Sequence, residues 1–206
     1  MKKRMLISHI IIVSSIFLIF GNTYTLFSYG FTPDLFLTDK LGISSIRVNN
    51  IISPKSVTEL QKIISNSTTP ISVIGAGYSQ GGHIGYPKGI AIDTSHLNKV
   101  IAFNEEEKII TVQAGATWYD VQKHIDPYDL SVKAMQSYNN FSVGGSISIN
   151  AHGRDIRYGS VINGIEAIQI VLADGNLVSA SRTENTDLLK LLLADMDYWV
   201  LSLKQQ

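Results

Sequence analysis

The apolar residues that follow position 50 recur with two alternating spacings. Apolar residues three or four positions apart predict a helix that opens within 53–56 and ends at 66–67; they are Val57, Leu60, Ile63 and Ile64. Thr117 is placed to cap a second helix that begins with Trp118. Short runs rich in β-branched residues predict strands at 71–74, 89–93, 100–103, 109–112, 164–172 and 177–180. The pattern therefore predicts one alternating α/β unit.

Two of the connections between these strands are typical of hairpins. The segment 104–108 joins two strands, and its three consecutive glutamates indicate a solvated turn with no catalytic role. The segment 173–176 contains Asp174-Gly175, a pair that tolerates the positive φ of a tight turn. We expect both pairs of strands to be antiparallel.

The first thirty residues have a different pattern. Basic residues 2–4 precede an apolar run over 5–20, which is typical of a signal peptide or membrane anchor. Sixteen residues fall slightly short of the ~20 that span a bilayer as a helix. An uncleaved anchor is our first interpretation, a cleaved signal the second and a buried core helix the third. Either of the first two places the folded domain on the non-cytoplasmic side, membrane-anchored or exported, after a linker over 31–50.

The composition excludes several functions. The chain has 17 Lys+Arg and 17 Asp+Glu, so it lacks the basic excess that nucleic-acid binding requires, and we expect no nucleic-acid partner. Cysteine is absent, which excludes disulfides, thiolate zinc sites, cysteine nucleophiles and a cysteinyl bond to a cofactor. No set of histidines has the spacing of metal ligands, so we predict no metal. Apolar residues make up 45%, enough for a sizeable core.

A glycine-rich segment at 75–83 directly follows a predicted strand. Successive N–H groups in such a segment can form an anion-binding nest, and a pyrophosphate is the natural guest. A nicotinamide-binding Rossmann fold is the competing interpretation, because Asp93 lies 18 residues after Gly75, near the ribose-binding position. That fold requires a helix after the glycines, whereas Gly81, Gly82 and nearby Pro87 oppose one. We therefore predict a loop, with a purely structural turn as the remaining alternative.

A second cluster, 141–153, places Gly144 and Gly145 before small hydroxyl and amide residues. The composition suits a backbone pressed against a cofactor, with Ser146, Ser148 and Asn150 as hydrogen-bond donors. Small residues also mark tight helix packing, so this signal alone leaves both possibilities open. Two such loops, about seventy residues apart, could hold one extended ligand between them.

Together these segments resemble the FAD-binding domain of the vanillyl-alcohol oxidase / p-cresol methylhydroxylase (PCMH) flavoproteins, which include sugar-lactone oxidases, alditol oxidases and cytokinin dehydrogenases. The resemblance covers about 51–189. Residues 75–79 look like the family's G-x-G-H-S pyrophosphate loop, and 142–148 like its S/T-V-G-G-x-x-S flavin loop. The same order continues in Val112–Ala116, Asn150–Gly153, Tyr158-Gly159 and Val171–Gly175.

The resemblance implies an α+β fold: a PCMH-type domain of two small α/β subdomains at 51–190, preceded by an N-terminal hydrophobic helix. It implies FAD as cofactor. The residues that the resemblance assigns to FAD binding are Gly75, Ala76, Gly77, Tyr78, Ser79, Gln80, Ser142, Gly144, Gly145, Ser148, Asn150, His152, Gly153 and Ile170. Many members attach FAD through a histidine at the position of Tyr78, so we expect non-covalent FAD here. His83 is expected to be an exposed loop residue.

The resemblance implies a flavin-dependent oxidoreductase that oxidises a hydroxyl-bearing small substrate, such as a sugar or lactone, by hydride transfer to FAD. It assigns no catalytic residue and no electron acceptor. A non-catalytic FAD-binding module and an inactive truncated remnant are the alternatives. Residues 191–206 depart from the glycine-rich family continuation. Codons for Met196–Val200, read in another frame, must encode Gly-Leu-Leu-Gly, so we predict that 191–206 is an out-of-frame tail.

Overall fold

A computed structural model of the chain describes residues 34–189 and 201–205. The chain divides into two units, Met1–Asp34 and Leu35–Gln206, and all the described helices and strands belong to the second. The predicted N-terminal hydrophobic helix and signal or anchor lie outside the described residues. Within the described ranges, no helix has the length and hydropathy that crossing a bilayer requires.

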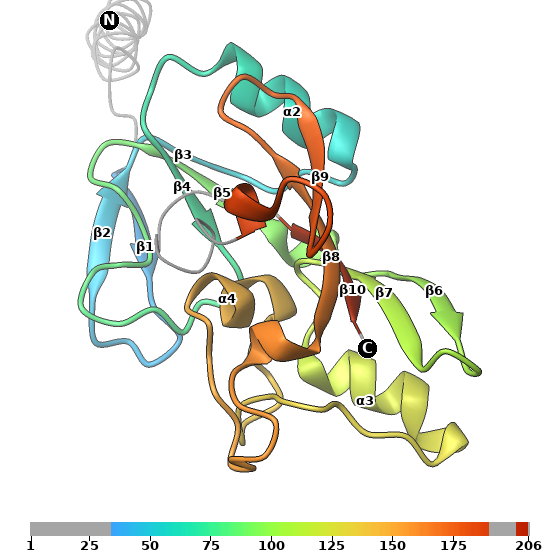
Figure 1. The fold of residues 1–206 in the computed structure, drawn as a ribbon. Helices are drawn as coiled ribbons and strands as arrows, with labels where there is room; N and C mark the ends of the chain where they lie inside the picture. Colours follow the sequence, from blue (N-terminus) through green and yellow to red (C-terminus); the bar gives the residue numbers. More distant parts are fainter. Residues whose placement is uncertain (1–33, 190–200, 206) are drawn as a thin grey trace, which may run out of the picture. The chain divides into compact units, whose positions relative to one another are not determined.

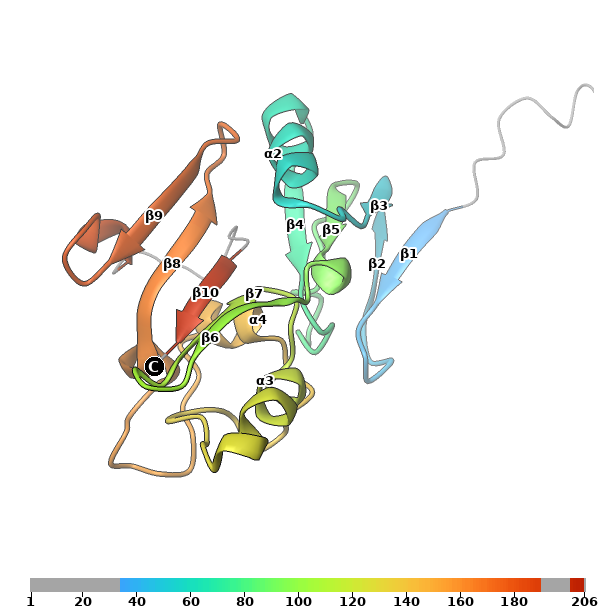
Figure 2. The same cartoon turned by 90° about the vertical axis from the view of Figure 1, so that its right-hand side faces the viewer.

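The second unit contains three sheets (Figures 1 and 2). A parallel sheet has the order β3-β5-β4, an antiparallel hairpin pairs β1 with β2, and a five-stranded antiparallel sheet has the order β6-β7-β10-β8-β9. The first two comprise β1 (Leu35–Thr38), β2 (Ser45–Val48), β3 (Asn50–Ile52), β4 (Ile71–Ile74) and β5 (Ile90–Asp93). The third comprises β6 (Val100–Asn104), β7 (Ile109–Gln113), β8 (Ile165–Val171), β9 (Leu177–Ser181) and β10 (Leu201–Gln205). The fold is thus a mixed α/β arrangement of sheets with few helices.

Both predicted helices are confirmed, and local capping explains where they begin. In α2 (Val57–Asn66) the N-cap Ser56 Oγ accepts a hydrogen bond from the Glu59 N–H at 3.1 Å. In α3 (Trp118–Ile125) Thr117 and Asp120 form a capping box, in which the Thr117 N–H donates to Asp120 Oδ2 at 2.9 Å. Each cap satisfies backbone donors that the first helical turn leaves without partners.

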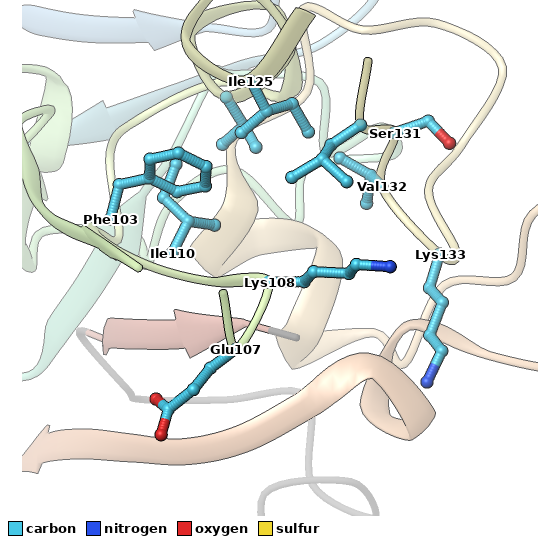
Figure 3. A pocket seen from close by; sticks show the side chains of 10 residues that line it. Phe103, Glu107, Lys108, Ile110, Ile125, Ser131, Val132 and Lys133 are labelled. Carbon is cyan, nitrogen blue, oxygen red and sulfur yellow. The ribbon is translucent and has the colours of Figure 1, made fainter. Parts of the chain in front are cut away.

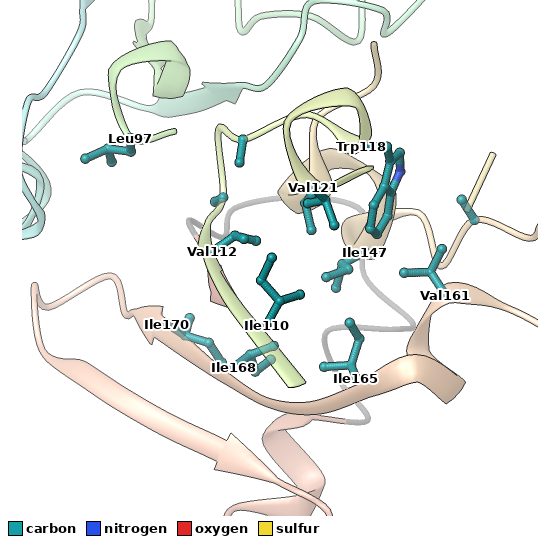
Figure 4. Close-up of a cluster of buried hydrophobic side chains, with 14 of the residues drawn as sticks. Leu97, Ile110, Val112, Trp118, Val121, Ile147, Val161, Ile165, Ile168 and Ile170 are labelled. Atoms are coloured by element: carbon teal, nitrogen blue, oxygen red, sulfur yellow. The ribbon is translucent and has the colours of Figure 1, made fainter. Parts of the chain in front are cut away.

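The core lies where α3 and α4 (Val143–Ser148) pack on one face of the five-stranded sheet (Figure 4). Trp118 is fully buried, and its indole N–H donates to Gln136 Oε1 and Ser146 Oγ, both at 2.9 Å. A smaller cluster, around Leu37, Val48 and Ile74, joins the β1–β2 hairpin to the parallel sheet. The two clusters hold the sheets on either side of the glycine-rich segments.

Two segments differ from what the sequence predicted. Residues 35–48, expected to be part of a linker, form the β1–β2 hairpin, because Leu37 and Val48 find apolar partners across the parallel sheet. Residues 143–148, expected to be a flavin loop, form the short helix α4. Between β4 and β5 the described chain contains no helix, as predicted from the glycines and Pro87.

Strand β10 belongs to the predicted out-of-frame tail and lies between β7 and β8, antiparallel to both. The Cα partners of Leu203 are Val112 and Ile168, two buried core residues. The rest of the tail, 190–200 and 206, lies outside the described residues. The reading frame that encodes 191–206 therefore stays a prediction, whereas β10 itself completes the sheet.

Candidate functional site

The loop after β4, residues 75–79, carries a row of unpaired backbone donors. Gly77 has φ of 80°, a left-handed conformation that glycine adopts without steric cost. Within the described part of the chain, the N–H groups of Gly77, Tyr78 and Ser79 donate to no acceptor. The Ala76 N–H, by contrast, donates to Ser142 Oγ at 3.1 Å. Successive free N–H groups of this kind can bind an anion.

This loop borders a cavity of about 650 Å³, called here the Gly77 cleft. Its wall includes residues 75–78, together with Lys40 from the β1–β2 hairpin and Gly115, Thr117 and Asn140. The volume is within the ~300–1,000 Å³ of small-molecule and cofactor sites. The hairpin also supports the loop directly, because the Lys40 N–H donates to the Gly77 carbonyl at 2.8 Å. The cleft thus combines free N–H donors with a lysine.

The β-turn that carries Lys40 is held by the buried carboxylate of Asp39. Its oxygens accept hydrogen bonds from the N–H groups of Leu41 at 2.9 Å, Ser44 at 2.8 Å and Ile43 at 3.2 Å. Burial alone raises the pKa of Asp39, but these donors together outweigh it and hold the pKa below its usual range. Asp39 therefore remains ionised and fixes the turn beside the Gly77 loop.

Two further carboxylates line the Gly77 cleft, and both are already engaged by the fold. Asp93 Oδ1 accepts from the Ser95 N–H at 2.9 Å, and Asp120 Oδ2 is part of the α3 capping box. Sequence reasoning did not include Asp93, Asp120 or Lys40 among the site residues. Their roles depend on strand ends and turns that meet only in the folded chain.

The second glycine cluster is helical, and its glycines serve close packing. A Cβ at Gly144 would lie 2.8 Å from Ala114 Cβ and 2.9 Å from the Ala114 carbonyl oxygen. A Cβ at Gly145 would lie 2.9 Å from Ser142 Oγ. The expectation of a loop was wrong. The segment forms the helix α4, whose small residues let it pack closely against Ala114, the residue that follows β7.

A smaller cavity of about 330 Å³, the Gly144 cleft, lies between the two glycine segments. Its wall includes Gly75 and Ser79 from the first segment and Gly144, Gly145 and Ser148 from the second. Gly75 lines both clefts, so they are adjacent. The structure thus brings most of the predicted cofactor residues together around two neighbouring cavities. Exposed His83 also lines the Gly144 cleft.

The remaining predicted residues lie elsewhere. Ser142 is buried between the two glycine segments, Gln80 is exposed in the loop, and the backbone of Gly153 packs against Met135. His152 is exposed, and its Nδ1 lies 3.1 Å from the Gly153 carbonyl oxygen. The Ile170 side chain is fully buried in the core of the five-stranded sheet (Figure 4). None of these five lines either cleft.

Asn150 follows α4 with a positive φ of 43°, and its side-chain Oδ1 is buried without a hydrogen-bond partner among the described residues. A buried acceptor without a partner lowers the free energy of unfolding, so a hydrogen-bond donor placed against this atom would stabilise the protein. Within the same part of the chain, no group of three or more His, Asp or Glu side chains is arranged to hold a metal ion.

Tyr78 belongs to an aromatic cluster with Tyr138 and Phe141, whose rings meet edge to face. The Tyr78 hydroxyl donates to Tyr138 Oη at 3.4 Å, which raises the pKa of Tyr78. The pKa of Tyr138 is lowered because its hydroxyl oxygen accepts from Tyr78 and from Asn140, with Lys40 adding a smaller charge effect. Tyr78 is thereby held at the edge of the Gly77 cleft.

These observations fit an extended ligand with a negatively charged centre. The free N–H groups of 77–79 and Lys40 suit a diphosphate, the adjacent Gly144 cleft gives room for a further part of the ligand, and Asn150 Oδ1 lacks a donor. Residues 48–181 match the family described as "FAD binding domain". The chain belongs to this FAD-binding domain family, and FAD is its cofactor.

The curated relatives are oxidases and dehydrogenases that are much longer than the matched region. The chain is 29% identical over 148 residues to a putative D-arabinono-1,4-lactone oxidase of Neurospora crassa, covering 70% of this chain and 26% of that protein. It is 26% identical over 137 residues to L-gulonolactone oxidase of Mus musculus, covering 65% and 31%. It is 30% identical over 154 residues to a probable D-2-hydroxyglutarate dehydrogenase of Oryza sativa subsp. indica, covering 66% and 26%. The chain thus spans about a quarter to a third of these relatives.

Proposed function

We propose that this chain is the FAD-binding half of a flavin-dependent oxidoreductase that oxidises a hydroxyl-bearing small molecule. The observation that carries the proposal is the pair of free N–H groups of Gly77 and Tyr78 on the wall of the Gly77 cleft, followed by that of Ser79 on the adjacent Gly144 cleft. These donors and the Lys40 ammonium would bind the diphosphate of FAD. The Ala76–Ser142 hydrogen bond would fix the position of that loop relative to α4, which borders the Gly144 cleft.

When bound, FAD supplies a ring that accepts a hydride from the hydroxyl-bearing carbon of the substrate. This chain's residues bind and orient the cofactor, and we assign no catalytic residue among them. The relatives named above act on lactones or a hydroxy acid, so a sugar lactone or a 2-hydroxy acid is the substrate class that we propose. The electron acceptor is left unassigned.

Two alternatives follow from the share of the relatives that the chain spans. A domain that covers 26–31% of each relative could bind FAD without turning over substrate. It could also be an inactive truncated remnant, if 191–206 are an out-of-frame tail. The binding module keeps the cofactor site without the chemistry, whereas the remnant has neither.

The deciding experiment is purification of the whole chain, followed by its flavin spectrum and anaerobic addition of a sugar 1,4-lactone or a 2-hydroxy acid. Substrate-dependent bleaching of a yellow protein supports the oxidoreductase. Yellow protein that does not bleach supports the binding module, and colourless insoluble protein supports the remnant. Sequencing the gene past codon 189 tests the tail, because the other frame must continue as an open, family-like reading frame.

Gly77→Ala and Gly42→Ala form a matched pair for testing the cofactor site. Both glycines have a positive φ, 80° and 70°, and neither Cβ would have a neighbour nearer than 3.5 Å, so the strain should be similar. Only Gly77 borders a cleft. We expect Gly77→Ala to lose FAD and Gly42→Ala to retain it. Equal retention by both variants would contradict the proposed diphosphate site.

We further propose that FAD is held without a covalent bond. Tyr78 occupies the position at which many relatives of this type carry the linking histidine, and a phenol cannot form that histidyl bond. Acid precipitation should therefore release free FAD into the supernatant. Flavin fluorescence that stays with the denatured polypeptide would refute this.

The N-terminal apolar segment is proposed to tether or export the chain, with the folded domain on the non-cytoplasmic side. Membrane fractionation of the chain with and without residues 1–30 tests this. We expect the intact chain in the membrane fraction, or a shorter mature protein outside the cytoplasm. A full-length chain that remains in the soluble cytoplasmic fraction would refute both.

A further inference from the structure

A third cavity has a volume of about 210 Å³ (Figure 3). Its walls come from β6, β7, the end of α3 and the segment 130–133. The apolar wall residues are Phe103, Ile110, Val121, Ile125, Leu130 and Val132. This cavity has no lining residue in common with the Gly77 or Gly144 cleft, so FAD bound there would not fill it.

The rim of this cavity is positively charged. Lys108 and Lys133 line it, with Ser131 beside them, and within the described residues neither ammonium forms an ion pair. The one acidic lining residue, Glu107, accepts a hydrogen bond from the Asn104 side-chain amide at 3.0 Å. In Figure 3 its carboxylate points away from both lysines. Two exposed lysines therefore lie at the rim of an apolar hollow, and among the described residues neither is paired with an acidic side chain.

We propose that this cavity binds a small organic carboxylate with an apolar body about the size of one ring. An apolar cavity of about 150 Å³ accommodates benzene, so 210 Å³ accepts a ring with a short substituent and is too small for a dinucleotide. The apolar wall would bury the ring, and Lys108, Lys133 and the Ser131 hydroxyl would bind the carboxylate at the mouth. Inorganic phosphate alone would leave the apolar walls uncovered.

The size of the cavity and the charge at its rim place separate requirements on the ligand. Burial of the ring requires apolar contact with side chains such as Phe103 and Ile125, so acetate should bind far more weakly than phenylacetate. The carboxylate requires the lysines, so the uncharged isostere phenylacetamide should also bind weakly. A ligand that meets only one requirement should lose most of the affinity.

The test is titration of the FAD-saturated full chain with phenylacetate, phenylacetamide and acetate, followed by calorimetry and by NMR shifts. We expect phenylacetate to bind with a Kd in the millimolar range or tighter, and the other two to bind at least tenfold more weakly. The Lys108→Gln/Lys133→Gln double variant should lose at least tenfold in affinity. Both lysines are exposed, so this variant should fold normally.

Lys123→Gln is the matched control, because Lys123 is an exposed lysine of α3 that does not line the cavity. This variant should bind phenylacetate as the unmodified chain does. Absent binding of phenylacetate, equal binding of phenylacetamide, or full affinity in the double variant would overturn the proposal. Competition between phenylacetate and FAD would place the probe in the cofactor clefts and would overturn it as well.

Discussion

Gly77 and Gly144 belong to two glycine-rich segments of similar composition and different structure. The first segment is a loop with a left-handed glycine and free N–H groups. The second contains a helix in which a Cβ added at Gly144 or Gly145 would lie within 3 Å of a neighbouring atom. Gly77 is needed for a backbone conformation, and Gly144 is needed for an absent side chain. Glycine therefore serves a backbone conformation in the first segment and close packing in the second.

The largest effect is expected for Gly144→Ala. In an exposed helix, this change would stabilise the protein by about 1 kcal/mol. Here the new Cβ meets the Ala114 Cβ and carbonyl oxygen, and overpacking of this kind costs about 1–3 kcal/mol. Urea unfolding should show the loss. Gly145→Ala is the control and should lose less, because its Cβ meets only the side-chain oxygen of Ser142. A more stable Gly144→Ala protein would contradict the packing role.

Gly77→Asn tests whether FAD binding requires the positive φ angle at Gly77. A left-handed conformation costs an ordinary L-residue about 1–2 kcal/mol, whereas asparagine tolerates it better. We therefore expect Gly77→Asn to retain more FAD than Gly77→Ala, as measured by flavin absorbance per polypeptide. Asparagine should give no such advantage over alanine at Gly144, because the neighbouring atoms and not the φ angle exclude a side chain there. Equal FAD loss in both Gly77 variants would mean that φ is not the cause.

Ser142→Ala tests the hydrogen bond that links the two segments. It removes the acceptor of the Ala76 N–H, and a hydrogen bond of this kind contributes about 1 kcal/mol. FAD affinity should fall by up to about tenfold, with a small loss of stability. Ser65→Ala is the control, because it removes a hydroxyl that donates to the Lys62 carbonyl within α2 and lines neither cleft. An unchanged FAD affinity in Ser142→Ala would show that the segments are positioned independently.

The smallest effect concerns Tyr78 and Tyr138. The lowered pKa of Tyr138 stabilises the fold at a pH above its unfolded value of about 10, and this contribution is lost as the pH falls through the folded pKa. The raised pKa of Tyr78 acts with the opposite sign: its contribution is complete below about pH 10 and is lost as the pH rises through the folded pKa. The two contributions change with pH in opposite directions, and tyrosinate absorbance should resolve the two titrations.

Tyr138→Phe removes the early-titrating phenol and the acceptor of Tyr78. We expect the lowest-pH tyrosinate transition to disappear and the Tyr78 titration to move toward the ordinary range. Tyr119→Phe, a change at an exposed tyrosine of α3, should leave both transitions in place. Retention of the early transition in Tyr138→Phe would assign it to another residue.

Local sequence patterns predicted the helices and turns that depend on interactions between residues close together in the sequence. The segment 53–56 and the cap Thr117 predicted where both helices begin, and Asp174-Gly175 predicted the β8–β9 hairpin. Glycines and Pro87 correctly excluded a helix between β4 and β5. Each of these signals is a hydrogen bond or a dihedral preference that acts between near neighbours, so one sequence is enough to detect it.

Long-range contacts decided the remainder. The β1–β2 hairpin exists because Leu37 and Val48 meet the parallel sheet, and β10 lies between two strands that are far from it in sequence. Lys40 reaches the Gly77 loop through a turn held by Asp39, and no motif joins these residues.

The two glycine segments, at 75–83 and 141–153, illustrate this division. Their composition and order alone were sufficient to indicate the FAD-binding family and the loop at 75–79, because both depend on local backbone chemistry. The close packing of Gly144, by contrast, depends on Ala114, thirty residues earlier in the chain. Burial and steric fit involve residues distant in sequence, so they are determined only when the chain has folded.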